Sequence, residues 1–223
     1  MQETLNWLSQ WCDKNFMSIN ASRIVEIRID FGRTKTQVPQ LQLHDSVIEI
    51  AQSAKLLGVI ISQDLKWDKH ADHIHTKVSQ RLHYLRTLRR SGLTQVQLRQ
   101  VYTTLIRPVL EYACPVWSTG LSDESKELLE TIQKRACRII APGFSYSAAL
   151  QQTGLEPLHV RRTQLCQKLF VDMQNTTHKL HSMLPPIKEC HYNIRNSKKY
   201  RLPKCKTNRT KNSFLPWCLF KFQ

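Results

Sequence analysis

The chain has 223 residues, of which 33 are Lys or Arg and 17 are Asp or Glu, so its formal net charge is +16 at pH 7. Apolar residues make up 41% and charged residues 22%, which excludes a wholly disordered chain and supports a core of ordinary size. No apolar run approaches the roughly 18–20 residues that cross a bilayer, and no secretory signal is visible at the start. We therefore expect an intracellular protein, nuclear or cytoplasmic, with no membrane partner.

The seven cysteines fall at wide spacings without a Cys-x-x-Cys motif. This pattern is a poor framework for disulfides and predicts buried free thiols. The alternative is a zinc knuckle formed by Cys190, His191, Cys205 and Cys218, whose spacings are irregular for such a site.

The positive charge is concentrated in two tracts that contain no acidic residue. Residues 190–223 hold nine Lys or Arg, and the stretch between Asp72 and Glu111 holds seven. Two separated basic tracts are the expected footprint of a protein that binds a polyanion through its phosphates. A solvated basic face and a disordered basic tail are the alternatives.

The first 60 residues have short helical and strand-like patterns. Residues 5–16 carry apolar side chains near helical spacing, which predicts a short amphipathic helix. Residues 25–31 alternate between apolar and polar side chains, as in a strand with one buried face. A polar turn at residues 44–46 predicts a small hairpin, and residues 55–61 predict a more buried strand.

From Asp64 onward the pattern is helical. Asp68, Thr94 and Ser122 can each cap a helix, and a fourth helix is expected near residues 160–174. The residues expected to point inward are Ile74, Val78, Leu82, Leu85 and Leu88 in the first helix, Leu98, Val101, Tyr102, Leu105 and Val109 in the second, and Leu165, Leu169 and Met173 in the fourth. The fourth helix is expected to present Arg161, Arg162 and Lys168, and a basic tail without periodicity follows.

The residue clusters that enzyme sites require are missing. Two-metal nucleotidyl transfer needs closely placed carboxylates, and the start of a helix already explains the adjacent pair Asp123-Glu124. His70 and Asp72 have the spacing of an iron-binding His-x-Asp pair. On a helix, however, such residues point about 200° apart. The sequence therefore names no catalytic residue, and His70 and Asp72 remain a metal candidate beside the zinc-knuckle alternative.

Several short segments follow one another in an informative order. They are residues 11–15 (WCDKN), 29–31 (IDF), 55–59 (KLLGV), 64–67 (DLKW), 106–112 (IRPVLEY), 115–117 (PVW) and 129–136 (LETIQKRA). This order resembles the part of non-LTR (LINE, jockey-like) retrotransposon reverse transcriptases that follows their catalytic aspartates. The resemblance implies a palm edge and primer grip in residues 1–63, a thumb in residues 64–145, a further helical region in residues 146–189 and a basic tail in residues 190–223.

The resemblance also implies a truncated element. The family's fingers and its catalytic aspartates would all precede Met1, and Arg23 stands where the family usually has Lys. The intact polymerase uses Mg, whereas this fragment is expected to hold no cofactor. The implied partners are RNA, DNA or a hybrid duplex, together with the missing polymerase portion.

The candidate nucleic-acid contacts follow from the same resemblance. The primer-grip role falls on Lys55, Leu57, Gly58 and Val59, and the thumb clamp falls on Lys77, Arg81, Arg86 and Arg90. Further basic candidates are Arg161, Arg162, Lys198 and Lys199.

A second resemblance gives a different function. Residues 57–88 are similar to a short segment assigned to the N-terminus of the AlkB-type tRNA-modifying dioxygenase/methyltransferase family. That segment carries no iron or methyl-donor site. Under this alternative, Fe and 2-oxoglutarate would act with His70 and Asp72.

We therefore expect an α+β chain with a mainly helical, thumb-like bundle. Its expected function is nucleic-acid binding by a reverse-transcriptase-derived protein without polymerase activity of its own. An AlkB-like enzyme and a translated genomic remnant without a selected role are the alternatives.

Overall fold

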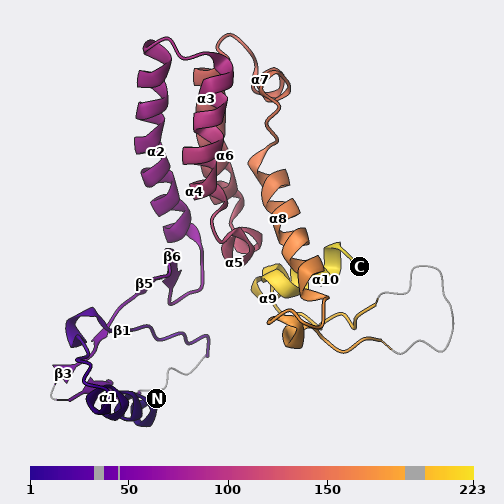
Figure 1. Ribbon diagram of the computed structural model, residues 1–223. Coiled ribbons are helices and arrows are strands. Elements are labelled where there is room, and N and C mark those ends of the chain that lie inside the picture. Colours follow the sequence, from indigo (N-terminus) through magenta and orange to yellow (C-terminus); the bar gives the residue numbers. More distant parts are fainter. Residues whose placement is uncertain (33–37, 45, 189–198) are drawn as a thin grey trace. The chain divides into compact units, whose positions relative to one another are not determined.

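The computed structural model describes residues 1–32, 38–44, 46–188 and 199–223, and it divides into two compact units, Met1–Lys69 and His70–Gln223 (Figure 1). Short strands occur in the first unit, and helices dominate the second. The fold is α+β with a helical bundle, as predicted. The finer four-part division stays a prediction.

The first unit begins with helix α1 (Gln2–Lys14), which contacts strand β2 (Gln42–Leu43). The Gln2 side chain donates to the carbonyl oxygen of Gln42 at 2.7 Å and accepts from its backbone N–H at 3.0 Å. The helix was expected to bury an apolar stripe, but Trp11 is 44% exposed and Phe16 is fully exposed. Cys12, the expected alternative to Trp11, is buried, and so is Ser9. The Ser9 hydroxyl lies 2.9 Å from Nε2 of His44, beside β2.

The strands of this unit form two-stranded pairs within the described residues. After the short 3₁₀ helix η1 (Ala21–Arg23), β1 (Val25–Glu26) pairs in parallel with β4 (Glu49–Ile50), and β2 pairs in antiparallel with β3 (Ser46–Val47). The predicted hairpin around residues 44–46 is confirmed, with Asp45 outside the described residues. The strand predicted over residues 25–31 is too long. Only its first two residues pair, and Ile29 and Phe31 remain exposed.

A third pair of strands corrects the single strand predicted over residues 55–61. β5 (Ser53–Leu56) and β6 (Val59–Ser62) form an antiparallel hairpin. Leu57 and Gly58 form its two-residue turn with φ values of +47° and +88°. Because positive φ at both central residues gives a turn whose twist matches the flanking strands, the chain reverses there.

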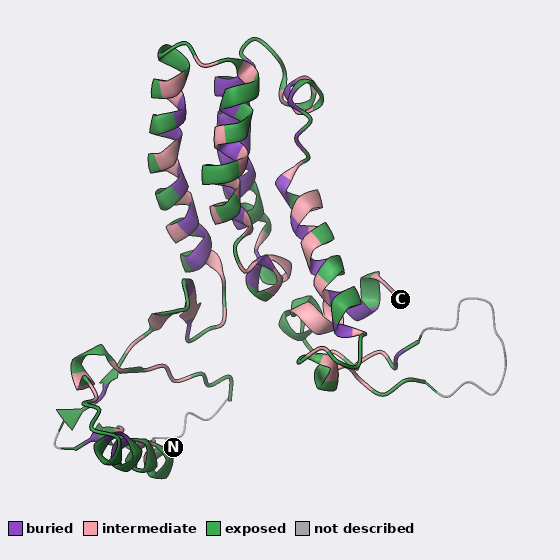
Figure 2. Cartoon of the chain, in the orientation of Figure 1, coloured by how far each residue is buried: buried purple, intermediate pink, exposed green. Residues whose placement is uncertain are grey.

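Helix α2 (Asp68–Arg90) begins the second unit and confirms the predicted stripe: Ile74, Val78, Leu82 and Leu85 are buried. Figure 2 shows the buried part of α2 along the side of the helix that faces α3. Asp68 is the first residue of the helix rather than its cap.

Thr94 caps helix α3 (Gln95–Val101), as predicted. Gln97 and Thr94 form a reciprocal capping box, in which the Thr94 backbone N–H donates to Oε1 of Gln97 at 2.9 Å.

Between α3 and helix α4 (Arg107–Glu111) the chain forms a π-helix, η2 (Tyr102–Ile106). Pro108 lacks an N–H and its ring clashes with the carbonyl four residues earlier, which favours a widened turn. The wider turn shifts the inward positions by one residue. Ile106 and Leu110 are therefore buried, and the prediction that Leu105 points inward is wrong, since its side chain is 54% exposed.

Helix α5 (Cys114–Trp117) and the 3₁₀ helix η3 (Ser118–Gly120) lead to helix α6 (Asp123–Ile140). Ser122 caps α6 as predicted, accepting from the backbone N–H of Ser125 at 3.2 Å. The next helix, α7 (Tyr146–Thr153), was not predicted; Ser145 caps its start and Gly154, at φ +63°, ends it. In Figure 1, α2, α3 and α6 lie side by side.

Helix α8 (Leu158–Met173) matches the predicted fourth helix, but its inner face differs. Arg162 was expected on the surface and is only 3% exposed. It occupies the same stripe as Cys166, Phe170 and Met173, at spacings of three and four residues, which places all of them on one side of the helix. The predicted inward residues Leu165 and Leu169 are half-buried.

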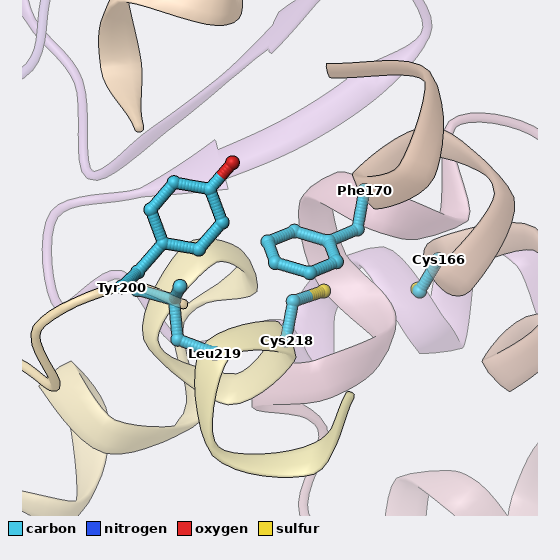
Figure 3. Close-up of a cluster of buried hydrophobic side chains, with 5 residues drawn as sticks. All are labelled: Cys166, Phe170, Tyr200, Cys218 and Leu219. Carbon is cyan, nitrogen blue, oxygen red and sulfur yellow. The ribbon is translucent and has the colours of Figure 1, made fainter. Parts of the chain in front are cut away.

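The C-terminal part of the chain packs back onto α8. The 3₁₀ helix η4 (His181–Met183) follows α8, and helices α9 (Asn208–Asn212) and α10 (Phe214–Lys221) lie close to the end. Figure 3 shows Cys166 and Phe170 from α8 meeting Cys218 and Leu219 from α10, with Tyr200 alongside. The described part of the predicted basic tail is therefore anchored by an apolar cluster.

The cysteines of the described residues are free thiols, and all of them except the half-buried Cys205 are buried. This confirms the predicted buried thiols, with Cys190 outside the described residues. In the part of the chain that the structure describes, no helix is both long and apolar enough to cross a bilayer.

Candidate nucleic-acid interface

Helix α2 carries most of the first basic tract. Within the described ranges, none of its lysines and arginines takes part in an ion pair. Lys77, Arg89 and Arg90 are exposed, and Arg86 is half-buried. A cation without an acidic neighbour keeps its full charge available for a phosphate, so α2 is a candidate phosphate-binding surface.

The four predicted clamp residues of α2 do not share one face. Lys77 and Arg86 are nine residues apart, which places them about 180° apart around the helix. Arg81 lies on the flank of Lys77, and Arg90 lies on the flank of Arg86. A single straight duplex therefore meets one pair or the other.

Arg81 has a structural partner. Its Nη1 donates a hydrogen bond to the carbonyl oxygen of Leu105 in the π-helix η2. This bond joins α2 to η2 and satisfies a carbonyl next to the widened turn. Arg81 therefore supports the bundle, and Lys77 is the freer cation of this flank.

The last turn of α2 holds the densest group of cations. Arg86, Arg89 and Arg90 lie within about 100° around the helix axis. Cations there also complement the negative end of the helix dipole, which stabilises the helix end. The whole helix, with 23 residues, is about 34 Å long, close to one turn of a B-form duplex.

The predicted primer-grip residues all lie in the β5–β6 hairpin of the first unit. Lys55 is exposed on β5, and Leu57 at the turn is 84% exposed. Val59 has a different environment, because it is only 7% exposed and belongs to the core of the unit. The hairpin thus presents the cation Lys55 and the exposed apolar residues Leu56 and Leu57, with Gly58 between Leu57 and β6.

Arg161 belongs to an ion-pair network at α8. Its Nε and Nη2 contact the two carboxylate oxygens of Glu111 at 3.1 Å and 3.3 Å. The hydrogen bond to Glu111 raises the pKa of Arg161. Glu111 also lies 3.8 Å from Arg107. This fork-to-fork geometry commits Arg161 to holding α8 against α4.

Arg162 is placed differently from its neighbour. Its guanidinium lies over the ring of Trp117, 5.6 Å from the ring centroid, and burial lowers the pKa of Arg162. Its Nη1 is buried and has no hydrogen-bond partner. The predicted nucleic-acid contact of Arg162 thus falls on a side chain in the interior of the bundle.

Lys199 is exposed and donates to Oε1 of Gln174 at 3.1 Å, while Lys198 lies outside the described residues. The cations that follow Lys199 in the described tail are Arg201, Lys204, Lys206, Arg209, Lys211 and Lys221.

The two residues of the candidate iron site are not brought together. His70 is 2% exposed and packs edge-on against Trp117, with ring centroids 5.3 Å apart. Asp72 is exposed on another face of α2. Among the described residues no group of three or more His, Cys, Asp or Glu side chains is placed to hold a metal ion. The zinc-knuckle pair Cys190 and His191 lies outside those residues.

One pair of neighbouring thiols was not predicted from the sequence. Cys114 on α5 and Cys166 on α8 share a hydrogen bond, and the Ser118 hydroxyl lies 3.6 Å from Sγ of Cys166. The Cys114 thiol lowers the pKa of Cys166 to about 7, and Arg162 contributes in the same direction. The two residues are 52 positions apart in the sequence, and nothing local to either one signals the pairing.

Comparison with known proteins points to the polymerases of transposable elements. The chain is 24% identical over 134 residues to a protein of Drosophila melanogaster described as probable RNA-directed DNA polymerase from transposon X-element. The match covers 59% of this chain and 14% of that protein. It supports a distant reverse-transcriptase-like relationship. No family model matches the chain, and no solved structure matches it.

Proposed function

We propose that this chain is a reverse-transcriptase-derived protein whose helical unit binds RNA, DNA or a hybrid duplex through phosphate contacts. The observation that carries the proposal is the set of α2 cations that form no ion pair with any described residue. The net charge of +16 and the distant similarity to a transposon polymerase support it. In this proposal the chain carries no cofactor of its own.

Within α2, the principal contact is the last turn. Arg86, Arg89 and Arg90 are close enough together to meet neighbouring phosphates of one strand, whereas Lys77 reaches a different flank. Phosphate contacts position a protein on a duplex without reading bases. The proposal therefore predicts strong dependence on salt and little dependence on sequence.

The β5–β6 hairpin is the second element of the proposal. Lys55 and the exposed tip residue Leu57 would meet the primer end, as the resemblance to the grip hairpin implies. Val59 would act indirectly, by holding the hairpin in the core of its unit.

The proposal assigns no polymerase activity to this chain alone. Nucleotidyl transfer by two metal ions needs carboxylates that converge on both ions. The adjacent acids Asp123 and Glu124 occupy the first turn of α6, where they complement the helix dipole, and Asp123 pairs with Lys126 at 2.8 Å.

The test measures, by fluorescence anisotropy, how tightly the full chain binds a labelled RNA–DNA primer–template across a series of salt concentrations. The charge-removal variant is Arg86→Gln with Arg89→Gln and Arg90→Gln. Each lost phosphate contact should make the slope of log affinity against log salt shallower by about 0.9, so the triple variant should lose about two to three units of slope.

The matched control removes the same charge elsewhere, through Arg135→Gln, Arg138→Gln and Lys168→Gln on α6 and α8. This control should keep most of the slope. Absence of binding at low salt, or an equal loss in both triple variants, would overturn the assignment to α2. Tighter binding to one sequence than to a scrambled duplex of the same length would also contradict it.

A further inference from the structure

A pocket of ≈ 420 Å³ lies among η3, α6, α8 and α10 in the second unit. Each helix lines it with one face: α6 through positions 123, 126, 127 and 130, α8 through positions 159, 162, 163 and 166, and α10 through positions 217 and 221. These spacings of three, four and seven residues are those of one helix face. Its lining residues include none from α2.

The three carboxylates that line the pocket are already engaged. Asp123 pairs with Lys126 at 2.8 Å, and Glu127 pairs with Lys134 at 2.5 Å. Glu130 accepts hydrogen bonds from the Tyr146 hydroxyl and from the backbone N–H of Leu158, the latter at 3.3 Å. Asp123 and Glu127 are thus each held by a lysine, whereas the charge of Glu130 also acts on the guanidinium of Arg162.

Two of the cations that line the pocket form no such ion pair among the described residues. Arg162 is 3% exposed, and its buried Nη1 has no hydrogen-bond partner. Within the described residues Lys221 forms no ion pair, and its Nζ lies 4.7 Å from the centroid of the Trp217 ring. A buried N–H donor without an acceptor is costly, so the unpartnered Nη1 of Arg162 points to an acceptor supplied from outside the chain.

A second orphaned polar atom lines the same pocket. Oγ1 of Thr119, on η3, is buried and has no hydrogen-bond partner. The hydroxyl and the guanidinium both donate hydrogen bonds, and an oxyanion accepts from both. The Cys166 thiol also lines the pocket, but its hydrogen bonds go to Cys114 and Ser118.

We propose that this pocket binds a phosphoryl group, with Arg162 and Thr119 as its inner donors and Lys221 as the cation nearer its rim. The pocket volume falls in the usual range for small-ligand sites. It therefore has room for the group that carries the phosphate, either as a free phosphomonoester or as the terminal phosphate of a nucleic-acid strand. This site is independent of the phosphate contacts proposed for α2.

The first experiment titrates the full chain with inorganic phosphate and follows the melting temperature against chloride at matched ionic strength. Wild type should show a saturable, phosphate-specific rise. Thr119→Val removes only an unpartnered hydroxyl, so the free protein should keep its melting temperature. Its phosphate affinity should fall about tenfold, the loss expected for one hydrogen bond to a charged group.

Arg162→Met and Lys221→Met should each weaken phosphate binding as well, and Lys168→Met is the matched control because Lys168 is exposed on α8 and does not line the pocket. The proposal is overturned if phosphate raises the melting temperature no more than chloride does. It is also overturned if Thr119→Val responds to phosphate as strongly as the wild type and the Lys168→Met control do. The Thr119→Val result keeps the test valid if Arg162→Met fails to fold.

A second pair of probes distinguishes the two sources of the phosphoryl group, a strand end and a free phosphomonoester. The probes are a 5′-phosphorylated oligonucleotide and its 5′-hydroxyl counterpart. If wild type binds the phosphorylated form more tightly and Thr119→Val shows no such preference, the result supports a strand end as the ligand. Equal binding of both oligonucleotides, together with the inorganic phosphate response, supports a free phosphomonoester. The triple variant of α2 should keep the phosphate response, so failure of one proposal is distinguishable from failure of the other.

Discussion

The Tyr102 hydroxyl donates a hydrogen bond to Oε1 of Gln133 at 2.6 Å, although the two residues are 31 positions apart in the sequence. The Gln133 amide nitrogen donates to the carbonyl oxygen of Glu156 at 2.8 Å and to the Tyr146 hydroxyl at 3.0 Å. The Tyr146 hydroxyl in turn donates to Glu130. One buried amide thus connects the π-helix, α6, α7 and the segment before α8.

Replacing this amide is expected to destabilise the helical unit. Gln133→Leu leaves the Tyr102 hydroxyl and the Glu156 carbonyl without partners, which costs about 1–3 kcal/mol of the free energy of unfolding. Tyr102→Phe should cost about 1 kcal/mol, and in the double variant the two costs should not add, because the same bond is removed. Urea denaturation measures all three variants. Gln151→Leu, on the exposed side of α7, is the control, and additive costs would contradict the shared bond.

On α2, Arg81 is expected to stabilise the fold, whereas Lys77 is expected to contact nucleic acid. Arg81→Met removes the donor to the Leu105 carbonyl oxygen and should lower the free energy of unfolding by about 1–2 kcal/mol. Lys77→Met should change it by less than about 0.5 kcal/mol, because Lys77 is exposed. Urea denaturation and duplex binding, measured on both variants, give the comparison. Equal stability of the two proteins would show that the Arg81 contact contributes nothing.

Features that depend on neighbouring residues in the sequence could be predicted, whereas contacts between distant segments could not. The caps at Thr94 and Ser122 were predicted because capping depends on residues within one turn. The burial of Arg162 was not predicted, because it depends on Trp117 in a helix distant in the sequence. The exposure of Leu105 was not predicted either, because it depends on the extra residue of the π-helix. The candidate interface was therefore predicted by its charge, and the structural partners of its arginines were missed.

The turn of the β5–β6 hairpin carries an apolar residue in a backbone conformation that favours Asn or Gly. Leu57 has φ +47° and is 84% exposed, so Leu57→Asn should relieve strain and stabilise the hairpin by about 0.5–1 kcal/mol. Slower hydrogen exchange of the amides of β5 and β6 would measure this. The same substitution at the neighbouring exposed residue, Leu56→Asn, is the control and should not slow exchange. If Leu57→Asn also weakens primer–template binding, the strained tip residue belongs to the proposed grip.

Arg161 is expected to matter for stability and not for nucleic-acid binding. Arg161→Lys keeps the charge but loses the two-pronged contact with Glu111, so the free energy of unfolding should fall by about 1 kcal/mol. The salt dependence of duplex binding should stay unchanged. Arg138→Lys on the exposed side of α6 is the matched control for denaturation. A shallower salt slope for Arg161→Lys would instead place Arg161 in the interface.

The Cys114–Cys166 pair should give the helical unit a stability maximum in mildly alkaline solution. An ordinary thiol, with a pKa of 9.0, keeps its proton in the unfolded chain, whereas Cys166 has its pKa lowered to about 7 by the thiol of Cys114. Between pH 7 and 9 the folded protein therefore binds fewer protons than the unfolded chain, and the free energy of unfolding rises with pH, on the order of 1–2 kcal/mol.

Above pH 9 the sign of this dependence reverses. The hydrogen bond to Cys166 raises the pKa of Cys114, and burial raises the pKa of Cys137 to about 11 and of Cys218 to about 12. The folded protein then keeps protons that the unfolded chain releases, so stability falls. Urea denaturation from pH 6 to 10.5 tests both limbs. Cys166→Ala should flatten the rise between pH 7 and 9, and Cys205→Ala, at a half-buried thiol outside the pair, should preserve it. A Cys166→Ala profile parallel to that of the wild type across this range would show that the pair does not titrate as a unit.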